Sequence, residues 1–384
     1  MQKPEQQTNL LKAPPDACPS VSASNACPSA SATTKPASQV DTTVFNKRLS
    51  LSVKIALCAS LVMVLLVSFA LGRFPVAPFE LLMGIYNHFA NPDMVASDLT
   101  LSKIDRVIFE IRLPRVLLVI LVGAGLSVAG ASYQGMFKNP LVSPDLLGAS
   151  AGASLGACLG MLFDMPVYLI QVFAFFGGLI AVAMAVWLNR VVRYDPILGL
   201  VLGGILVSTL FSAGMSLVKY VADAQDKLPE ITFWLMGSFS SVNSRDFIWG
   251  LFPFVAGFVI LLLQSWQLNV LSFGDEEARS MGVNTRRTRM LVIIASTLLA
   301  SASVAVAGII GWIGLVIPHL ARAIVGPNYR LLLPTSMFIG ACYLLIVDDI
   351  ARLASAVEIP IGILTAILGV PFFVFIFRRN MRGW

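Results

Sequence analysis

The feature that most constrains this chain is a succession of apolar runs, each close to the length of a membrane-spanning helix. About 20 apolar residues in helical conformation cross the hydrocarbon core of a bilayer. Ten runs approach that length, at residues 55–71, 116–135, 146–163, 166–188, 196–218, 247–263, 290–310, 312–325, 333–351 and 361–377. Backbone groups in lipid must find partners within their own segment, so these runs are expected to be helices. The sequence therefore predicts an all-α polytopic membrane protein with about ten transmembrane helices.

Composition agrees with this class and excludes a soluble globular domain. The mean hydropathy is +0.81, 57% of the residues are hydrophobic and only 12% are charged. Of the five cysteines, two lie in the N-terminal region and three inside apolar runs, so they are interpreted as small hydrophobic residues. We expect no disulfide framework, no metal site and no nucleic-acid partner.

The first 46 residues differ from the rest of the chain. They are rich in Ser, Ala, Thr and Pro, and they contain almost no large apolar residues that could form a core. The first apolar run begins near Ile55, too late for a signal peptide. We therefore predict a disordered cytoplasmic tail at 1–46 and a transmembrane domain at 47–384.

The orientation is predicted from Lys and Arg in the loops, which are enriched on the cytoplasmic side. With ten spans, both termini lie on one side of the membrane. One alternating set of loops holds most of the basic residues: Lys47, Arg48, Lys138, Arg190, Arg193, Arg279, Arg286, Arg287, Arg289, Arg330, Arg378, Arg379 and Arg382. This set, with the N- and C-termini, is therefore predicted to be cytoplasmic.

One cytoplasmic loop, residues 274–289, is longer and more patterned than a connection between two helices requires. Seven of its residues are charged, with acids first and arginines second. Ser272 with Asp275 is interpreted as a capping box, Gly282 as a helix stop, and Asn284 as the cap of a second short helix. Two short helices outside the membrane are predicted. They form either a solvated anchor or a docking surface for a soluble partner.

The opposite side contains two longer segments, 72–113 and 219–246, with short amphipathic helices expected at 76–89 and 228–239. Arg112, Arg115 and Arg352 lie near the outer helix ends, against the usual charge bias. Pro114 is expected in a first helical turn, where it would fix the direction of the two neighbouring arginines. The three arginines either bind an anionic partner or extend to lipid headgroups.

Two carboxylates and one histidine fall within apolar runs. Asp348 and Arg352 are four residues apart, an arrangement that favours an ion pair on one helix face, and Asp348 with Asp349 could instead form a proton relay. His319 follows Pro318 and is expected to hydrogen-bond to backbone freed by that proline. No metal-ligand spacing surrounds it.

Glycines at 148, 152 and 156 share one face of a predicted helix. Small residues at this spacing let two membrane helices approach closely. Packing within one subunit is the simplest interpretation, and a wall of a translocation path or a subunit interface is the alternative.

Several stretches together resemble the permease family of ABC importers for iron–siderophore complexes, haem and vitamin B12, over most of residues 53–379. They are Arg112-Leu-Pro-Arg115, Gln134 with Asn139-Pro-Leu-Val-Ser-Pro144, Leu147-Gly148, Trp234-Leu-Met-Gly237, the loop 274–289, Gly311-Trp-Ile-Gly-Leu-Val-Ile-Pro-His-Leu-Ala-Arg322, Leu332-Leu-Pro334, Asp348-x-x-Ala-Arg352, Glu358-Ile-Pro-Ile-Gly362 and Gly369-Val-Pro-Phe-Phe373. The acidic Asp349 and the 46-residue tail depart from the family pattern.

The resemblance implies the type II ABC importer permease fold, with ten helices in each of two subunits, expected as a homodimer, and a central path. It implies that the loop 274–289 is the coupling segment held by a separate ATPase, and that the three outer arginines dock an external substrate-binding protein. The coupling residues would be Asp275, Glu276, Glu277, Arg279, Ser280, Gly282, Val283, Arg286 and Arg287. Asn139 and Leu141 match the family's cytoplasmic gate.

The chain lacks a Gly-x4-Gly-Lys-Ser/Thr phosphate loop, so ATP and Mg²⁺ are expected on the partner ATPase and no cofactor is expected here. The predicted function is import of an iron chelate, with iron–siderophore the first choice, across a bacterial inner membrane. Haem and cobalamin are alternative cargoes. A proton-coupled secondary transporter is an alternative of another class, and no catalytic constellation indicates a membrane enzyme.

Overall fold

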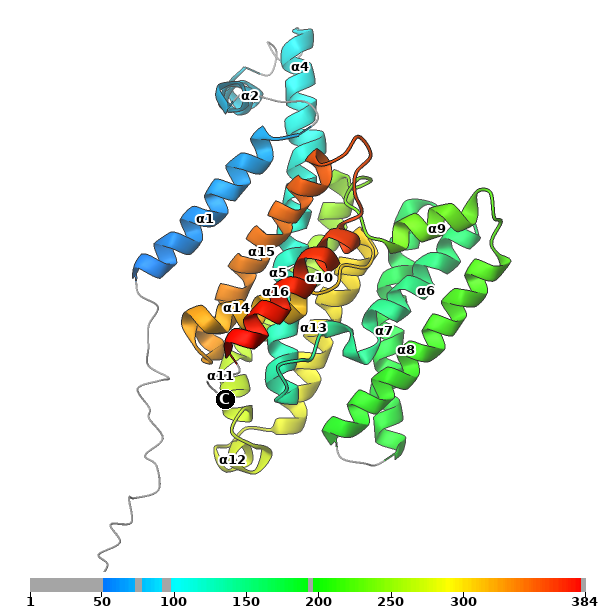
Figure 1. Cartoon of the computed structure of the whole chain (residues 1–384), viewed down its shortest axis with the longest axis vertical. Helices are drawn as coiled ribbons and strands as arrows, with labels where there is room; N and C mark the ends of the chain where they lie inside the picture. The colour runs from blue at the N-terminus through cyan, green and yellow to red at the C-terminus, as the bar shows by residue number, and fades with distance from the viewer. Residues whose placement is uncertain (1–50, 73–77, 92–97, 193–195, 381–384) are drawn as a thin grey trace, which may run out of the picture. The chain divides into compact units, whose positions relative to one another are not determined.

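The structure is a computed structural model of the 384-residue chain, and it describes residues 51–72, 78–91, 98–192 and 196–380. The predicted tail at 1–46 lies outside these ranges. The described residues form helices joined by short connections (Figure 1). The helices are α1 Leu51–Ala70, α2 Pro78–Ala90, α4 Leu99–Arg106, η1 Val107–Arg112, α5 Leu113–Phe137, η2 Pro144–Leu147, α6 Ala149–Leu162, α7 Val167–Val192, α8 Pro196–Val221, α9 Lys227–Leu235, α10 Ser244–Leu263, α11 Ser265–Leu271, α12 Asp275–Ser280, α13 Thr285–Ala307, α14 Ile313–Val325, α15 Tyr329–Leu353 and α16 Ile361–Asn380.

All ten predicted spans correspond to helices, which confirms the predicted fold class. Within the described ranges, seven helical segments are long and apolar enough to cross a membrane, while α6, α14 and the apolar part of α16 are shorter. At 1.5 Å per residue, the 13 residues of α14 extend only about 20 Å, less than the roughly 30 Å of hydrocarbon. Helix α14 therefore needs neighbouring protein around its ends.

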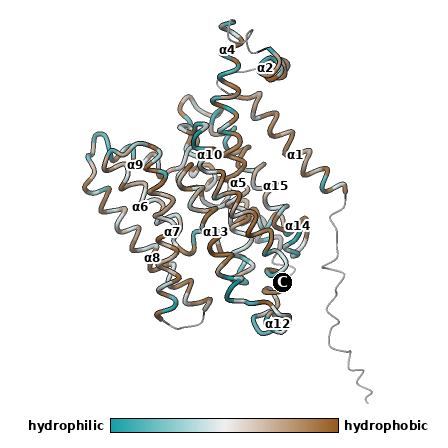
Figure 2. The backbone as a smooth tube through the Cα atoms, turned by 180° about the vertical axis from the view of Figure 1, so that it is seen from behind, coloured by the Kyte–Doolittle hydropathy of each residue, from teal (hydrophilic) through white to brown (hydrophobic). Residues whose placement is uncertain are grey.

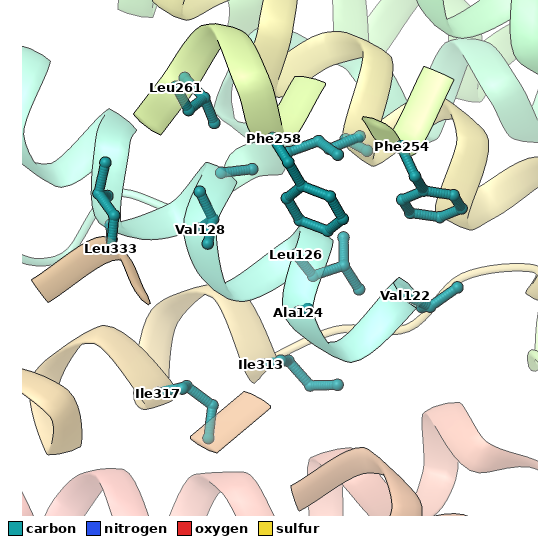
Figure 3. Packing of buried hydrophobic residues seen from close by; sticks show 14 of the residues in the cluster. Val122, Ala124, Leu126, Val128, Phe254, Phe258, Leu261, Ile313, Ile317 and Leu333 are labelled. Atoms are coloured by element: carbon teal, nitrogen blue, oxygen red, sulfur yellow. The ribbon is translucent and has the colours of Figure 1, made fainter. Parts of the chain in front are cut away.

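Helix α5 lies at the centre of the largest core, as the close view in Figure 3 shows. It packs against α10, α13, α14 and α15. Leu126 and Val128 of α5 lie near Phe258 of α10, Ile317 of α14 and Leu333 of α15. A second, smaller core joins α6 and α7 to α9. Apolar residues dominate the long helices, whereas the loop around α12 is more hydrophilic (Figure 2).

Glycines let the central helices approach one another. A Cβ atom added to Gly130 of α5 would lie 1.9 Å from the carbonyl oxygen of Gly314 in α14. In the predicted glycine face of α6, a Cβ on Gly152 or Gly156 would lie 2.4 or 2.1 Å from carbonyl oxygens of α7. At Gly152 and Gly156 the structure therefore shows packing within one chain, the simplest of the three interpretations.

The segment before α5 is more helical than predicted. Residues Thr100–Phe137 form one continuous helical segment of 38 residues, in which η1 is a π-helical stretch. Pro114 lies in the first turn of α5, as predicted, but no new helix starts there, because the helical segment continues into α5 from α4 and η1. The wider π turn just before the proline accommodates its missing N–H group. This long segment would extend about 57 Å, well beyond the hydrocarbon of a bilayer.

Both short amphipathic helices predicted outside the spans are present. Helix α2 packs against α4, where His88 Nδ1 lies 2.7 Å from Asp105 Oδ1 and the imidazole stacks on Phe109. Helix α9 ends at Leu235, four residues before the predicted end. Gly237 stops it, because its φ of +78° is not helical and its backbone lies against Ile309.

Candidate functional site

The charged loop 274–289 forms a defined structure built around helix α12. Gly274 precedes the helix with φ +147°, and a Cβ there would lie 1.9 Å from the Glu277 carboxylate. The helix ends in a Schellman motif at Gly282, whose φ is +81°, as predicted. The predicted capping box was wrong, because the Ser272 hydroxyl donates to the Asn269 carbonyl and Gly274 occupies the N-cap.

Asn284 caps a helix as predicted, with its side-chain oxygen accepting from the Arg287 N–H at 3.0 Å. The helix that it caps is not a second short helix. It is α13, which begins at Thr285 and continues for 23 residues through an apolar run. Arg286 and Arg287 therefore occupy the first turn of a long helix, so a force applied to them acts directly on that helix.

Burial divides the nine predicted coupling residues into two groups. Seven are exposed: Glu276, Glu277, Arg279, Ser280, Gly282, Arg286 and Arg287. Val283 is buried and packs into the core together with Ala278 of α12. Asp275 is partly buried. The loop therefore presents a charged face outward while two apolar side chains anchor it to the helical bundle.

Asp275 connects the loop to two other elements. Its carboxylate accepts a hydrogen bond from Arg289 of α13 at 2.7 Å and lies 4.0 Å from Lys138 Nζ at the end of α5. Lys138 has a left-handed backbone with φ 51° and ends α5 immediately before Asn139-Pro140. The first residue of α12 is thus in ionic contact with the start of the predicted gate.

The predicted gate residues lie in a tight turn after α5. The Asn139 side-chain oxygen accepts from the Leu141 N–H at 2.9 Å, and the Leu141 side chain is 52% exposed. His319 Nε2 of α14 lies 2.9 Å from the Pro140 carbonyl oxygen. His319 therefore bonds to backbone, as expected, but to the gate turn rather than to backbone near Pro318.

Two asparagines that the sequence interpretation did not select connect α11 to α15. Asn269 donates to the Asn328 side chain at 2.9 Å and accepts from the Tyr329 N–H at 2.8 Å. Asn328 in turn caps α15 through the Arg330 N–H. Asn328 directly before the apolar helix is a recognisable N-cap signal, whereas Asn269 carries no local signal because its partners lie about 60 residues away.

The opposite end of the molecule contains a buried cluster of charged residues. Arg115 donates to both oxygens of Asp348 and to both oxygens of Glu358, at distances of 2.8 to 3.2 Å. Arg352 lies 3.1 Å from Asp348, as the spacing predicted, and also pairs with Asp349. Each side chain of the cluster is at most 18% exposed.

The three arginines predicted to dock an outer partner are all buried, at 4% exposure for Arg112 and 7% for Arg115 and Arg352. Arg112 donates to the Phe69 carbonyl, and Arg352 donates to Ser68 at 2.9 Å. These contacts join the end of α1 to η1 and α15. Docking by the arginines remains a prediction, and their contacts within the chain give them a structural role as well.

A mainly apolar cavity of about 480 Å³ lies between the end of α9, the turn before α14, and α16. Met236, Trp312 and Ile363 are among its lining residues. Trp312 has φ +69°, a left-handed conformation that is rare for a large side chain, and Gly369 of α16 leaves room for its Cβ. Among the described residues no group of three or more His, Cys, Asp or Glu could hold a metal ion.

The chain is similar to known transport proteins over most of its length. The model of the FecCD transport family matches residues 57–379. The molybdate import system permease protein MolB of Haemophilus influenzae is 42% identical over 278 residues, covering 72% of this chain and 82% of that protein. A Helicobacter pylori protein described as a probable iron chelatin transport system permease is 38% identical over 304 residues, covering 79% and 90%.

A solved structure agrees in fold. The inward-facing structure of a metal-chelate type ABC transporter superposes with a TM-score of 0.75 at 38% identity, covering 85% of this chain and 99% of that one. The family model covers nearly the whole described chain, including the helical bundle and the charged loop around α12. The chain therefore belongs to the FecCD transport family and is a membrane-spanning ABC transporter permease.

Proposed function

We propose that this permease imports a metal chelate, with iron–siderophore the first candidate, across the bacterial inner membrane and is driven by separate ATPase subunits. The observation that carries the proposal is the construction of the charged loop. Its outward face is charged and exposed, while Asp275 contacts Arg289 of α13 and Lys138, the residue before the gate turn. A loop built only as a connection would not need this link to the gate.

In the proposed mechanism, two permease chains form a homodimer around the path, and each charged loop rests on one ATPase. Nucleotide binding brings the ATPases together and moves the loops. Because Arg286 and Arg287 begin α13, and Asp275 contacts Lys138, this motion reaches both α13 and the gate turn. Hydrolysis returns the gate to its first position, and both termini are on the ATPase side.

We further propose that an external substrate-binding protein docks at the end of the molecule that holds the buried charge cluster. Arg112, Arg115 and Arg352 remain the predicted docking residues. In this structure they are engaged within the chain, so docking through their side chains would require exchange of internal partners. Asp348 and Asp349 are both paired with arginine, which disfavours a freely titrating proton relay.

The apolar pocket bears on the choice of cargo. Its walls, with Leu235, Ile309 and Ile367 beside the residues named above, would contact a cargo that has apolar surface. A small oxyanion such as molybdate, the cargo in the name of the Haemophilus relative, is usually held by charged or N–H donors. Haem and cobalamin are further bulky candidates.

The proposal is tested by charge reversal at the coupling face. Arg286→Glu with Arg287→Glu is expected to abolish co-purification of the permease with its ATPase, since both side chains are exposed beside an acidic helix. A matched control is Arg106→Glu with Lys103→Glu on α4, at the opposite end of the α4–α5 helical segment, which is expected to leave the ATPase attached. Retention of the ATPase by the coupling-face variant would refute the role of this loop.

The cargo is identified by reconstituting the permease with its ATPase into proteoliposomes. ATP-dependent uptake is measured for a ferric siderophore, haem, cobalamin and molybdate at equal concentrations, and uptake of the ferric siderophore is expected. Uptake of molybdate alone would overturn the chelate proposal while leaving the ABC mechanism intact. Accumulation against a gradient by the permease without any ATPase would instead establish the secondary-transporter alternative.

A further inference from the structure

A long apolar groove runs between α7 and α10, both of which pack against α13. Its volume is about 900 Å³. The floor is formed by α13, where Ala302 and Ala305 leave space between Leu298 and Val306. The walls come from aromatic and aliphatic side chains of α7 and α10, including Tyr168, Val172, Phe176, Trp249, Phe252 and Pro253.

The groove lies within the part of the molecule that crosses the membrane. Helices α7, α10 and α13 are each long and apolar enough to span a bilayer. The wall residues Val172, Phe176 and Phe252 are 43%, 54% and 79% exposed in the isolated chain. Exposed apolar side chains on spanning helices face lipid unless a protein covers them, so hydrocarbon chains are the natural contents of this groove.

One end of the groove is polar. Gln171 of α7 donates to the Asp246 carboxylate of α10 at 3.0 Å and so joins the two walls. Asp246 is 6% exposed and also accepts from the Asn243 N–H, so its charge is already engaged. Tyr168 and Trp249 line the same end. Tyrosine and tryptophan are enriched at the level of lipid headgroups, which indicates where the interface lies.

Arg245 provides a positive charge at this end. Its side chain is exposed and lines the groove, and within the described part of the chain its guanidinium has no ion pair or hydrogen bond. Its neighbour Asp246 is buried and accepts from Gln171 and from backbone, so the exposed N–H groups of Arg245 are the charged donors available to a ligand. Guanidinium groups bind phosphate oxygens in charge-assisted, often bidentate hydrogen bonds.

We propose that this groove is a binding site for one anionic phospholipid, with an acyl chain between α7 and α10 and the phosphate on Arg245. The volume is within the range of sites that hold single small molecules. The apolar walls, the aromatic end and the exposed arginine match the order of chain, interface and headgroup in a phospholipid. The lipid contacts both α10 and α7, and α7 in turn packs against α6 and α8.

The proposal is tested by native mass spectrometry of the full chain with defined lipids. The purified protein is titrated with phosphatidylglycerol or phosphatidylcholine of identical acyl chains. Arg245→Gln is expected to weaken binding of phosphatidylglycerol about fivefold, the contribution of one basic residue at an anionic surface, and to leave phosphatidylcholine unchanged. Arg106→Gln, whose arginine is already paired with Glu110, serves as the matched control with no expected effect.

A second pair of variants tests the acyl-chain part of the site. Leu298→Trp fills the floor and is expected to reduce retention of both lipids. Ile248→Trp, on an exposed position of α10 outside the groove lining, should retain both. A fluorescence experiment tests the site independently in the protein without substitutions in the groove. Phosphatidylglycerol brominated in its acyl chains should quench the fluorescence of Trp249. The contribution of Trp249 is obtained as the difference in fluorescence from Trp249→Phe. Three results would each overturn the proposal. They are equal affinity of the unchanged protein for the two lipids, unchanged phosphatidylglycerol affinity in Arg245→Gln, and no quenching of Trp249.

Discussion

At the scale of single residues, the buried charges are the most informative feature. Arg115 uses its guanidinium to bind two carboxylates, each in two-point contact, and these come from α15 and from the connection between α15 and α16. An ion in apolar surroundings is stable only if it is paired, so each member of such a cluster depends on the others. The cluster therefore fixes the start of α5 relative to α15 and to the start of α16.

This dependence can be measured by Arg115→Met. The variant leaves Asp348 with Arg352 alone and Glu358 without its arginine, so the free energy of unfolding is expected to fall by about 3–5 kcal/mol. Denaturant unfolding in detergent micelles gives the value. The control is Arg106→Met, whose exposed pair with Glu110 is expected to contribute less than about 1 kcal/mol. Equal losses in the two variants would contradict a structural role of the cluster.

At the scale of elements, helix contacts in this chain are governed by how closely the backbones approach. Between protein and lipid the hydrophobic effect offers little preference, so membrane helices associate through close packing of small residues. The contact of Gly156 with the Phe173 carbonyl in α7 is of this kind, and Gly130 with Gly314 repeats it between α5 and α14. Neither contact has space for a methyl group.

Gly156→Ala is accordingly expected to lower the free energy of unfolding by about 1–3 kcal/mol, because α6 and α7 must move apart to accept the methyl group. The same substitution at Gly311, where a Cβ would have no atom within 4 Å, is the matched control and is expected to change stability by less than about 0.5 kcal/mol. Thermal unfolding in detergent compares the two. If only Gly311→Ala lost stability, close packing of α6 on α7 would not determine the stability of the protein.

At the scale of the whole molecule, a continuous set of contacts joins the charged loop to the gate turn. Asp275 contacts Arg289 and Lys138, and the gate turn that follows Lys138 is held from the other side by His319 of α14. Motion of α12 therefore has a physical route to the predicted gate, through side chains that are already in contact.

This route predicts different effects for two neighbouring acids. Asp275→Asn weakens the ion pairs with Arg289 and Lys138, so the transported cargo per ATP hydrolysed is expected to fall several-fold while the ATPase stays bound. Glu276→Gln alters only an exposed side chain and is expected to act on ATPase affinity instead. Uptake, ATP hydrolysis and co-purification in proteoliposomes separate the two outcomes. Loss of ATPase binding in Asp275→Asn would place Asp275 on the ATPase surface rather than on the route to the gate.

Much of the fold could be predicted because it depends on local patterns. The ten spans follow from the length of apolar runs, and the end of α12 and the start of α13 follow from Gly282 and Asn284. The errors came where local rules compete with the surroundings. Pro114 lies in the first turn of α5 as predicted, yet the π-helical stretch before it continues the helix, so α5 is not a separate helix. Ser272 could cap a helix, yet its hydroxyl bonds to the preceding turn.

The sequence by itself determined the membrane class, the helices and the family, because hydrophobic length, helix caps and motif spacing are properties of neighbouring residues. Only the tertiary structure decided which charges are available to a partner. Arg112, Arg115 and Arg352 appear in the sequence as outward cations, and packing places them inside the chain with carboxylates and carbonyls from distant elements. Arg245 resembles them in sequence but lies exposed beside the groove between α7 and α10. Burial and pairing arise from contacts between residues far apart in the chain, and these form only when the helices pack.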